Sequence, residues 1–251
     1  MHSHILFNVD DGPKTSEETI CLFEQAVAEG ITAIISTSHA LHPFYNVPFD
    51  VVNEQIAQLQ TEIDLRNLPL KLYPGHEVRL AGNILELYEK KQLHTLANSN
   101  YLLLELPSNF IPKYTRDLIY TLLTAGITPI IAHPEKNREI AENPNYLQQF
   151  IRDGALAQIT AGSLAGIHGS DIQKLSLKFI RSNLVHTYGS DVHNLKTRPF
   201  LFEKGLRVLE KQKELDTVDY FLENNERIIH NQPLILYEPE DNFTKKRWKF
   251  F

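Results

Sequence analysis

The chain has 251 residues, of which 42% are hydrophobic and 22% charged, and its net charge at neutral pH is −6. This length can bury one core of α/β-barrel size or two smaller cores, and the acidic balance gives no sign of a nucleic-acid binder. The single cysteine excludes an internal disulfide and a cysteine-rich zinc site. Because the chain has neither a membrane-length apolar run nor the layout of a signal peptide, we expect a cytoplasmic protein without an integral membrane segment.

The opening stretch of the chain carries two histidines and an acidic pair. His2 and His4 are two positions apart, so on a strand their side chains point to the same side and can bind one metal ion together. Asp10, Asp11 and Gly12 follow and end this strand, which places carboxylate oxygens at its carboxyl end. Taken alone, the stretch fits either a metal site or a polar N-terminus that happens to carry two histidines.

Apolar, β-rich runs alternate with helix-like segments along almost the whole chain, a pattern typical of a parallel α/β architecture. After the opening strand, six more strands are predicted at residues 31–38, 70–73, 101–104, 128–132, 155–160 and 184–188. Helices are predicted at residues 15–30, 50–66, 83–91, 113–125, 145–153, 168–182, 200–213 and 217–225. We therefore expect one domain over residues 1–232, built as a TIM-like barrel of seven rather than eight strands.

The C-terminal tail, residues 233–251, differs from this domain in its composition. It ends in a basic and aromatic run from Lys245 to Phe251. Such a run can contact a partner or a membrane surface, but chain ends are more often frayed or locally packed, and this is our prediction for the tail.

Residue types that bind metals recur at the ends of six of the seven predicted strands. Each one alone would be an ordinary surface or core residue. Because the carboxyl ends of barrel strands converge on the active site, their recurrence at this one position indicates a shared site. The nine candidate ligands are His2, His4, Asp11, His39, Glu77, Glu105, His133, Asp191 and His193.

The ligand types narrow the choice of metal and of chemistry. Imidazole and carboxylate without thiolate suit Mn²⁺, Fe²⁺ or Zn²⁺. Nine candidates exceed what one ion can use, so we expect two or three ions that share bridging carboxylates. Such a cluster is typical of phosphate ester hydrolysis. Lys136 and Arg198 follow two of the metal-bearing strands and are candidates to bind phosphate oxygens, and the planar guanidinium is the better shaped of the two.

The remaining histidines have no matching placement and are expected to be ordinary residues: His42, His76, His94, His168, His186 and His230. His76 precedes Glu77 on an extended segment and should point the other way. Cys21 lies in the first predicted helix, and Val27 stands six positions further on. The cysteine-then-arginine loop of thiol-based phosphatases is therefore absent, and we expect Cys21 to be a core residue.

These residues, in this order, resemble the polymerase and histidinol phosphatase (PHP) superfamily, and within it the bacterial tyrosine phosphatases encoded with capsule and exopolysaccharide genes. The resembling blocks extend to about residue 230. They are His-Ser-His-Ile-Leu with Asp-Asp-Gly-Pro-Lys-Thr (2–15), Ile-Ser-Thr-Ser-His (35–39), Pro-Gly-His-Glu-Val-Arg (74–79), Leu-Leu-Glu-Leu-Pro (103–107), Ile-Ala-His-Pro-Glu-Lys-Asn (131–137), Ala-Gly-Ser-Leu-Ala-Gly (161–166) and Gly-Ser-Asp-Val-His-Asn (189–194) with Arg198-Pro199.

The resemblance implies a distorted seven-stranded barrel, a metal cluster held by the nine ligands, most often of Mn²⁺, and a phosphate contact at Arg198. It implies hydrolysis of phosphotyrosine by a metal-bridging hydroxide, with Asp191 and His193 in the catalytic site. The expected substrate is the phosphorylated tail of a membrane-associated tyrosine kinase for polysaccharide export. The family usually has arginine where this chain has Lys136, and a few more residues before His2, so we expect a weaker second phosphate contact and a looser grip by His2 and His4.

Two other functions remain open at the level of the sequence. One is a small-molecule phosphoesterase of the same superfamily, such as a histidinol phosphatase. The other is a PHP domain that only binds a partner, although such domains lose metal ligands and this chain keeps all nine. The sequence leaves the oligomeric state open.

Overall fold

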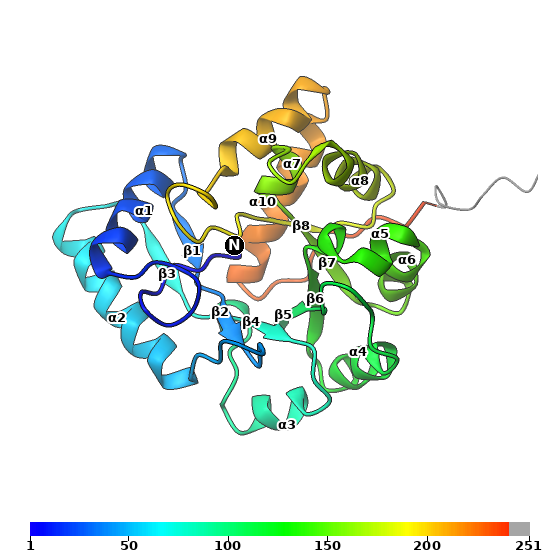
Figure 1. Cartoon of the computed structure of the whole chain (residues 1–251), viewed down its shortest axis with the longest axis horizontal. Helices are drawn as coiled ribbons and strands as arrows, with labels where there is room; N and C mark the ends of the chain where they lie inside the picture. The colour runs from blue at the N-terminus through cyan, green and yellow to red at the C-terminus, as the bar shows by residue number, and fades with distance from the viewer. Residues whose placement is uncertain (241–251) are drawn as a thin grey trace, which may run out of the picture.

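The structure is a computed structural model that describes residues 1–240. Six parallel strands form the main sheet in the order β2-β4-β5-β6-β7-β8, and β1 pairs with β3 in a small parallel sheet (Figure 1). The bounds are β1 Ala33–Ile35, β2 Ser38–Ala40, β3 Lys71–Tyr73, β4 His76–Arg79, β5 Tyr101–Glu105, β6 Thr128–Ala132, β7 Leu156–Thr160 and β8 Thr187–Gly189. The predicted parallel α/β architecture is confirmed.

The predicted strand at residues 31–38 is divided into two short strands, and the predicted strand at residues 70–73 is followed by an additional strand that was not predicted. The prediction at 31–38 corresponds to β1 and β2, and the chain around residues 70–79 forms β3 and β4. The second break falls at Pro74, which has no N–H to donate, and at Gly75, where an added Cβ would lie 2.9 Å from the carbonyl oxygen of Ser36. After each break the chain passes from the small sheet (β1 and β3) to the main sheet (β2 and β4). His39 and Glu77 therefore lie within β2 and β4 rather than after a strand end.

The opening stretch is not the regular strand that the sequence predicts. His2 and Asn8 have left-handed backbone angles, with φ of 52° and 56°, and these interrupt an extended conformation. Its backbone is instead held between the two edges of the main sheet: Thr37, just before β2, donates to the carbonyl of Ser3 at 2.8 Å, and His4 donates to the carbonyl of Val192, after β8, at 2.9 Å. A closed barrel of seven strands is therefore not confirmed, since only an isolated bridge joins Ser3 to Val192.

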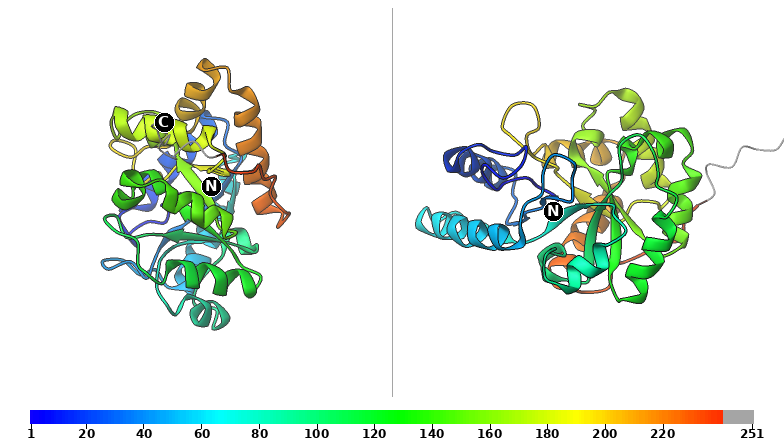
Figure 2. Two further views of the ribbon diagram at one scale, coloured as in Figure 1. Left: turned by 90° about the vertical axis from the view of Figure 1, so that its right-hand side faces the viewer. Right: turned by 60° about the horizontal axis from the view of Figure 1, so that its bottom comes forward.

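The helices cover the outside of the strands, as the two further views in Figure 2 make plain. Their bounds are α1 Ser16–Ala28, α2 Phe49–Leu65, α3 Ile84–Glu89, α4 Thr115–Thr124, α5 Arg138–Glu142, α6 Asn145–Arg152, α7 Ala161–Leu164, α8 Ser170–Arg181, α9 Phe202–Lys211 and α10 Leu215–Ile229. All eight predicted helices are present. The short α5 and α7 and two 3₁₀ turns, Leu96–Asn98 and Pro134–Lys136, were not predicted, because so few residues give no helical period. Within residues 1–240, no helix is both long and apolar enough to cross a bilayer.

Period-two alternation along the strands divides the core into an outer and an inner layer. Val78, Leu104 and Ile131 are in register on neighbouring strands and pack with helix residues such as Leu122 in the outer core. The alternate positions face the inside of the curved sheet, where apolar residues such as Leu103 give way toward the carboxyl ends to polar ones. The fold therefore aims the polar residues of several strands at one place.

Two smaller predictions have clear outcomes. The side chain of His76 does point away from Glu77, and its Nδ1 accepts a hydrogen bond from the backbone N–H of His94 at 3.0 Å. Cys21, in contrast, is exposed, so its placement in the core was wrong. Leu22 and Phe23 occupy the buried face of α1 instead.

The described part of the tail packs against the domain. Ile235 exchanges hydrogen bonds with the side chain of Asn224 in α10, and the N–H of Glu240 donates to the carbonyl of Ser182, after α8, at 2.9 Å. The basic and aromatic run from Lys245 to Phe251 lies outside the described residues.

A buried histidine at the amino-terminal end of β8 gives a first prediction. Burial lowers the pKa of His186 to about 4, and its Nδ1 accepts a hydrogen bond from the N–H of Ala157. An unfolded histidine titrates near 6.5, so between about pH 6.5 and 4 the unfolded chain binds a proton that the folded chain does not. The free energy of unfolding should therefore fall as the pH drops through this range.

In His186→Asn this contribution is absent, so stability should depend less steeply on pH than in the wild type, by up to about 1.4 kcal/mol per pH unit. Urea denaturation in EDTA between pH 7 and 4.5 measures the difference. His230→Asn is the matched control, because the side chain of His230 is 57% exposed. Parallel pH profiles for the wild type and His186→Asn would contradict the prediction.

Candidate metal centre

All nine candidate ligands lie together inside the curved sheet. They form four overlapping groups in which one ligand atom from each residue lies within 4.8 Å of those of the others. The groups are His4 with Asp11, His39 and His193; His2 with His4 and Glu77; His2 with His133 and Asp191; and His39 with Glu77 and Glu105. Residues from opposite ends of the chain thus share one site, as their recurrence at the ends of the predicted strands indicates.

Glu77 is the centre of this cluster. Its Oε1 lies 2.8 Å from His133 Nε2 and 3.4 Å from His2 Nε2. Its Oε2 lies 3.2 Å from His4 Nε2 and 3.3 Å from His39 Nδ1. Each carboxylate oxygen therefore faces its own pair of imidazoles, which is the arrangement a carboxylate needs to bridge two ions.

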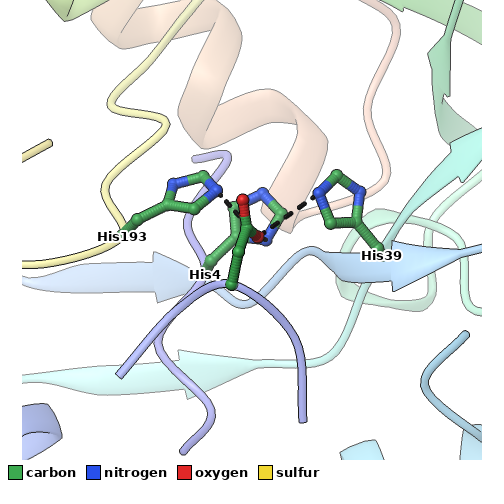
Figure 3. A group of neighbouring side chains, drawn as sticks. His4, His39 and His193 are labelled. Carbon is green, nitrogen blue, oxygen red and sulfur yellow. Dashed lines mark ion pairs between the residues drawn. The ribbon is translucent and has the colours of Figure 1, made fainter. Parts of the chain in front are cut away.

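Asp11 makes a similar junction nearer the surface. Its Oδ1 lies 3.2 Å from His193 Nε2 and 3.5 Å from His39 Nε2. Figure 3 shows His193 and His39 approaching one carboxylate from opposite sides, with His4 between them. His39 faces Asp11 with one ring nitrogen and Glu77 with the other, so it connects the outer and inner groups.

The unsatisfied polar atoms of the site fit bound cations. Buried donors and acceptors normally have a hydrogen-bond partner, and leaving one without costs about 1–3 kcal/mol. Six buried ligand atoms in the cluster have no hydrogen-bond partner: His2 Nε2, His4 Nε2, Asp11 Oδ1, His39 Nδ1, Glu105 Oε2 and His193 Nε2. Nitrogen and oxygen donors of this kind suit divalent Mn, Fe or Zn, and the residues present therefore fit a metal cluster.

Neighbouring hydrogen bonds orient the imidazoles. His4 Nδ1 donates to Asp10 Oδ2 at 3.0 Å, and His2 Nδ1 donates to Gln158 Oε1 at 2.6 Å. Each bond fixes the tautomer that leaves Nε2 free for a metal. The sequence did not single out either partner, although Asp10 stands in the acidic pair and Gln158 faces inward from β7.

The protonation of His193 and Asp191 at neutral pH suits metal binding. Burial, followed by the nearby His4, lowers the pKa of His193 to about 4, so the imidazole is neutral. Burial works to raise the pKa of Asp191, but Lys136, His2 and Arg198 outweigh it and hold this pKa well below its usual value. Burial and then the charge of Glu77 raise the pKa of Glu105. A bound cation would favour its ionised form.

Basic side chains line one wall of a cavity of about 240 Å³ that opens onto the cluster. Lys136 Nζ lies 2.6 Å from Asp191 Oδ2, and Arg198 Nη2 lies 2.9 Å from both oxygens of the same carboxylate. The two predicted phosphate contacts are thus brought together. The sequence missed two further residues that line this cavity: Arg79, whose Nε lies 3.2 Å from Glu105 Oε2, and His42.

Comparison with known proteins decides the family. Residues 1–230 match the family model described as capsular polysaccharide synthesis, CpsB/CapC. The chain belongs to the CpsB/CapC family. CapC of Staphylococcus aureus is 40% identical over 99% of this chain and 97% of its own length. The tyrosine-protein phosphatase YwqE of Bacillus subtilis is 38% identical over 100% of this chain and 99% of its own.

A solved CpsB/CapC structure has the same fold. It comes from work on YwqE of Bacillus subtilis and CpsB of Streptococcus pneumoniae, described there as metal-dependent tyrosine phosphatases. It superimposes with a TM-score of 0.92 at 39% identity, over 95% of this chain and 97% of its own. The family that the sequence resembles is confirmed.

The hydrogen bond from His4 to Asp10 gives a prediction about metal affinity. In Asp10→Asn a neutral amide replaces the carboxylate that orients His4, so Mn²⁺ affinity should fall about 10–100-fold. Calorimetric titration of metal-stripped protein measures this. Asp171→Asn is the control, since that side chain is 97% exposed, and unchanged affinity in Asp10→Asn would show that this hydrogen bond does not support metal binding.

Proposed function

We propose that this CpsB/CapC protein is a metal-dependent protein-tyrosine phosphatase. The observation that carries the proposal is the buried cluster of imidazoles and carboxylates beside two cationic side chains in one cavity. Full-length similarity to YwqE, a named tyrosine-protein phosphatase, supports it. The side chains of Arg198 and Asp11 are 36% and 34% exposed, so the site is open enough for a residue on a protein.

The proposed cofactor is a set of two or three divalent ions, most suitably Mn²⁺, with Fe or Zn as alternatives. His2, His133 and Asp191 would hold one ion, His4, Asp11, His39 and His193 another, and Glu105 would complete a third position with His39 and Glu77. When bound, such ions polarise phosphoryl oxygens and make a water nucleophilic at neutral pH.

The chain's own residues would bind and orient the phosphate. Arg198 offers a planar pair of donors that matches two phosphate oxygens, and Lys136 adds a point charge on the same side. Tyrosine leaves as a phenolate of pKa near 10, so this leaving group needs little help from a general acid. Cys21 is exposed on α1 and has no part in this chemistry.

The proposed substrate is the phosphorylated tail of a tyrosine kinase that drives polysaccharide export, in keeping with the description of the family. We place the reaction in the cytoplasm and assign it to residues 1–232. Counted with the opening stretch as a seventh strand, the main sheet would correspond to a distorted seven-stranded barrel.

The test is phosphate release by metal-stripped protein with Mn²⁺ added back, on a phosphotyrosine peptide and on histidinol phosphate. The proposal expects metal-dependent release from the peptide and little from histidinol phosphate. Preference for histidinol phosphate would favour a small-molecule phosphatase, and no activity on either would favour a binding domain.

Replacement of Arg198 should damage catalysis more than replacement of Lys136. Removing a charged group that stabilises the transition state costs about 10²–10³ in rate, so we expect a loss of this size in kcat/KM for Arg198→Ala. Lys136→Ala should lose roughly tenfold, because its ammonium cannot bind two oxygens at once. Initial rates on a phosphotyrosine peptide at saturating Mn²⁺ measure both.

Arg207→Ala is the matched control, because Arg207 is exposed on α9 and pairs with Glu203. Its activity should equal that of the wild type. Equal losses in the Arg198 and control variants would show that Arg198 has no specific role.

A further inference from the structure

The loop that follows β2 is a preformed turn beside the metal centre. Val47 N–H donates to the carbonyl of His39 at 2.9 Å, which closes the loop at its base. Leu41, with a left-handed φ of 59°, donates its N–H to Asn46 Oδ1 at 2.9 Å. These contacts hold the loop in one shape without any contribution from a substrate.

The loop carries two aromatic rings that pack beside a candidate metal ligand. The ring of His42 stacks on that of His39 at 4.5 Å between centroids, with 24° between their planes. Tyr45 stacks on His42 at 5.6 Å and 16°. Tyr45 also lies 5.8 Å from His39 at 11°, so the three nearly parallel rings form one compact aromatic wall.

Besides the candidate ligand His39, His42 is the member of this wall that lines the cavity. It shares the cavity with the two phosphate-binding candidates, Lys136 and Arg198. Its Nδ1 accepts a hydrogen bond from the N–H of Phe44 at 3.3 Å, which fixes the plane of the ring. The ring is therefore in place before a ligand enters.

Two exposed phenylalanines each neighbour a residue that lines the cavity. Phe44, next in the loop, is 83% exposed, and its ring lies 5.7 Å from that of His42. Phe110, in the loop after β5, is 56% exposed, and its carbonyl accepts a hydrogen bond from Asn137, another cavity residue. Both side chains therefore lie where the part of a peptide that remains outside the cavity can contact them.

We infer that His42 is the stacking surface for the aromatic ring of the substrate, and that Phe44 and Phe110 contact the residues flanking it in an extended peptide. This inference rests on the proposed function and adds a basis for selecting aryl phosphates. Arg198, Lys136 and His42 line one cavity, so a phosphate bound at the two cations would leave its phenyl ring in the cavity that His42 lines. A phosphoserine has no ring to stack there, so only an aryl ester gains this contact.

Binding of two phosphonates to the Mn²⁺-loaded protein tests the inference without relying on turnover. Phenylphosphonate and methylphosphonate share the charged group, so the ratio of their dissociation constants isolates the contribution of the ring. Calorimetry of the wild type, His42→Ala and His42→Phe gives this ratio. Tyr120→Ala is the matched control, since Tyr120 is an aromatic residue 74% exposed on α4 and absent from the cavity.

We expect the wild type to prefer phenylphosphonate, and His42→Ala to reduce this preference about 3–10-fold, the range for one aromatic pair. His42→Phe should restore it, because a stacking ring is retained. Phe44→Ala should raise the KM of a phosphotyrosine peptide with little change in kcat, since Phe44 contacts flanking residues only.

Two results would overturn the inference. One is that His42→Ala weakens both phosphonates equally, which would mean that His42 acts through His39 and the metals. The other is a wild type with no preference for phenylphosphonate. A wild type that prefers phenylphosphonate but does not hydrolyse phosphotyrosine would refute the proposed function and leave the aromatic subsite standing.

Discussion

The buried carboxylate of Glu77 is the constraint on which the site depends. Four imidazoles converge on its two oxygens, and several of their nitrogens have no other partner. Such a group is stable inside a protein only when charges and hydrogen bonds are satisfied, and divalent ions satisfy both demands at once. A protein whose only need was stability would fill this space with apolar side chains, so the cluster is a functional feature.

The irregular parts of the fold serve this cluster. The breaks between β1 and β2 and between β3 and β4 bring His39 and Glu77 side by side in register. The opening stretch occupies the gap between the two edges of the main sheet, so His2 and His4 enter the interior fully buried. Hydrogen bonds from Nδ1 to Gln158 and Asp10 hold the two rings in place there. A regular barrel strand with its alternation would not provide the left-handed turn at His2.

The sequence predicted the metal-binding side chains better than the residues and strand breaks that position them. Recurrence of metal-binding residue types after apolar runs brought out all nine clustered side chains, because parallel strands end at the same edge. The orienting residues Asp10 and Gln158 were missed, since a hydrogen bond across 156 positions, as between Gln158 and His2, leaves no local pattern. The broken strands and the role of His42 were missed for the same reason: they depend on close approaches, such as that of Gly75 to Ser36, that only the folded chain displays.

We propose that both carboxylate oxygens of Glu77 would help to hold the ions of a cluster of two or three. Anomalous diffraction at the manganese edge, from crystals of the Mn²⁺-loaded protein, tests this most directly. The account predicts at least two peaks, one at each carboxylate oxygen of Glu77, with imidazole nitrogens of His2 and His133 around one and of His4 and His39 around the other. A single peak, or peaks that do not touch Glu77, would contradict it.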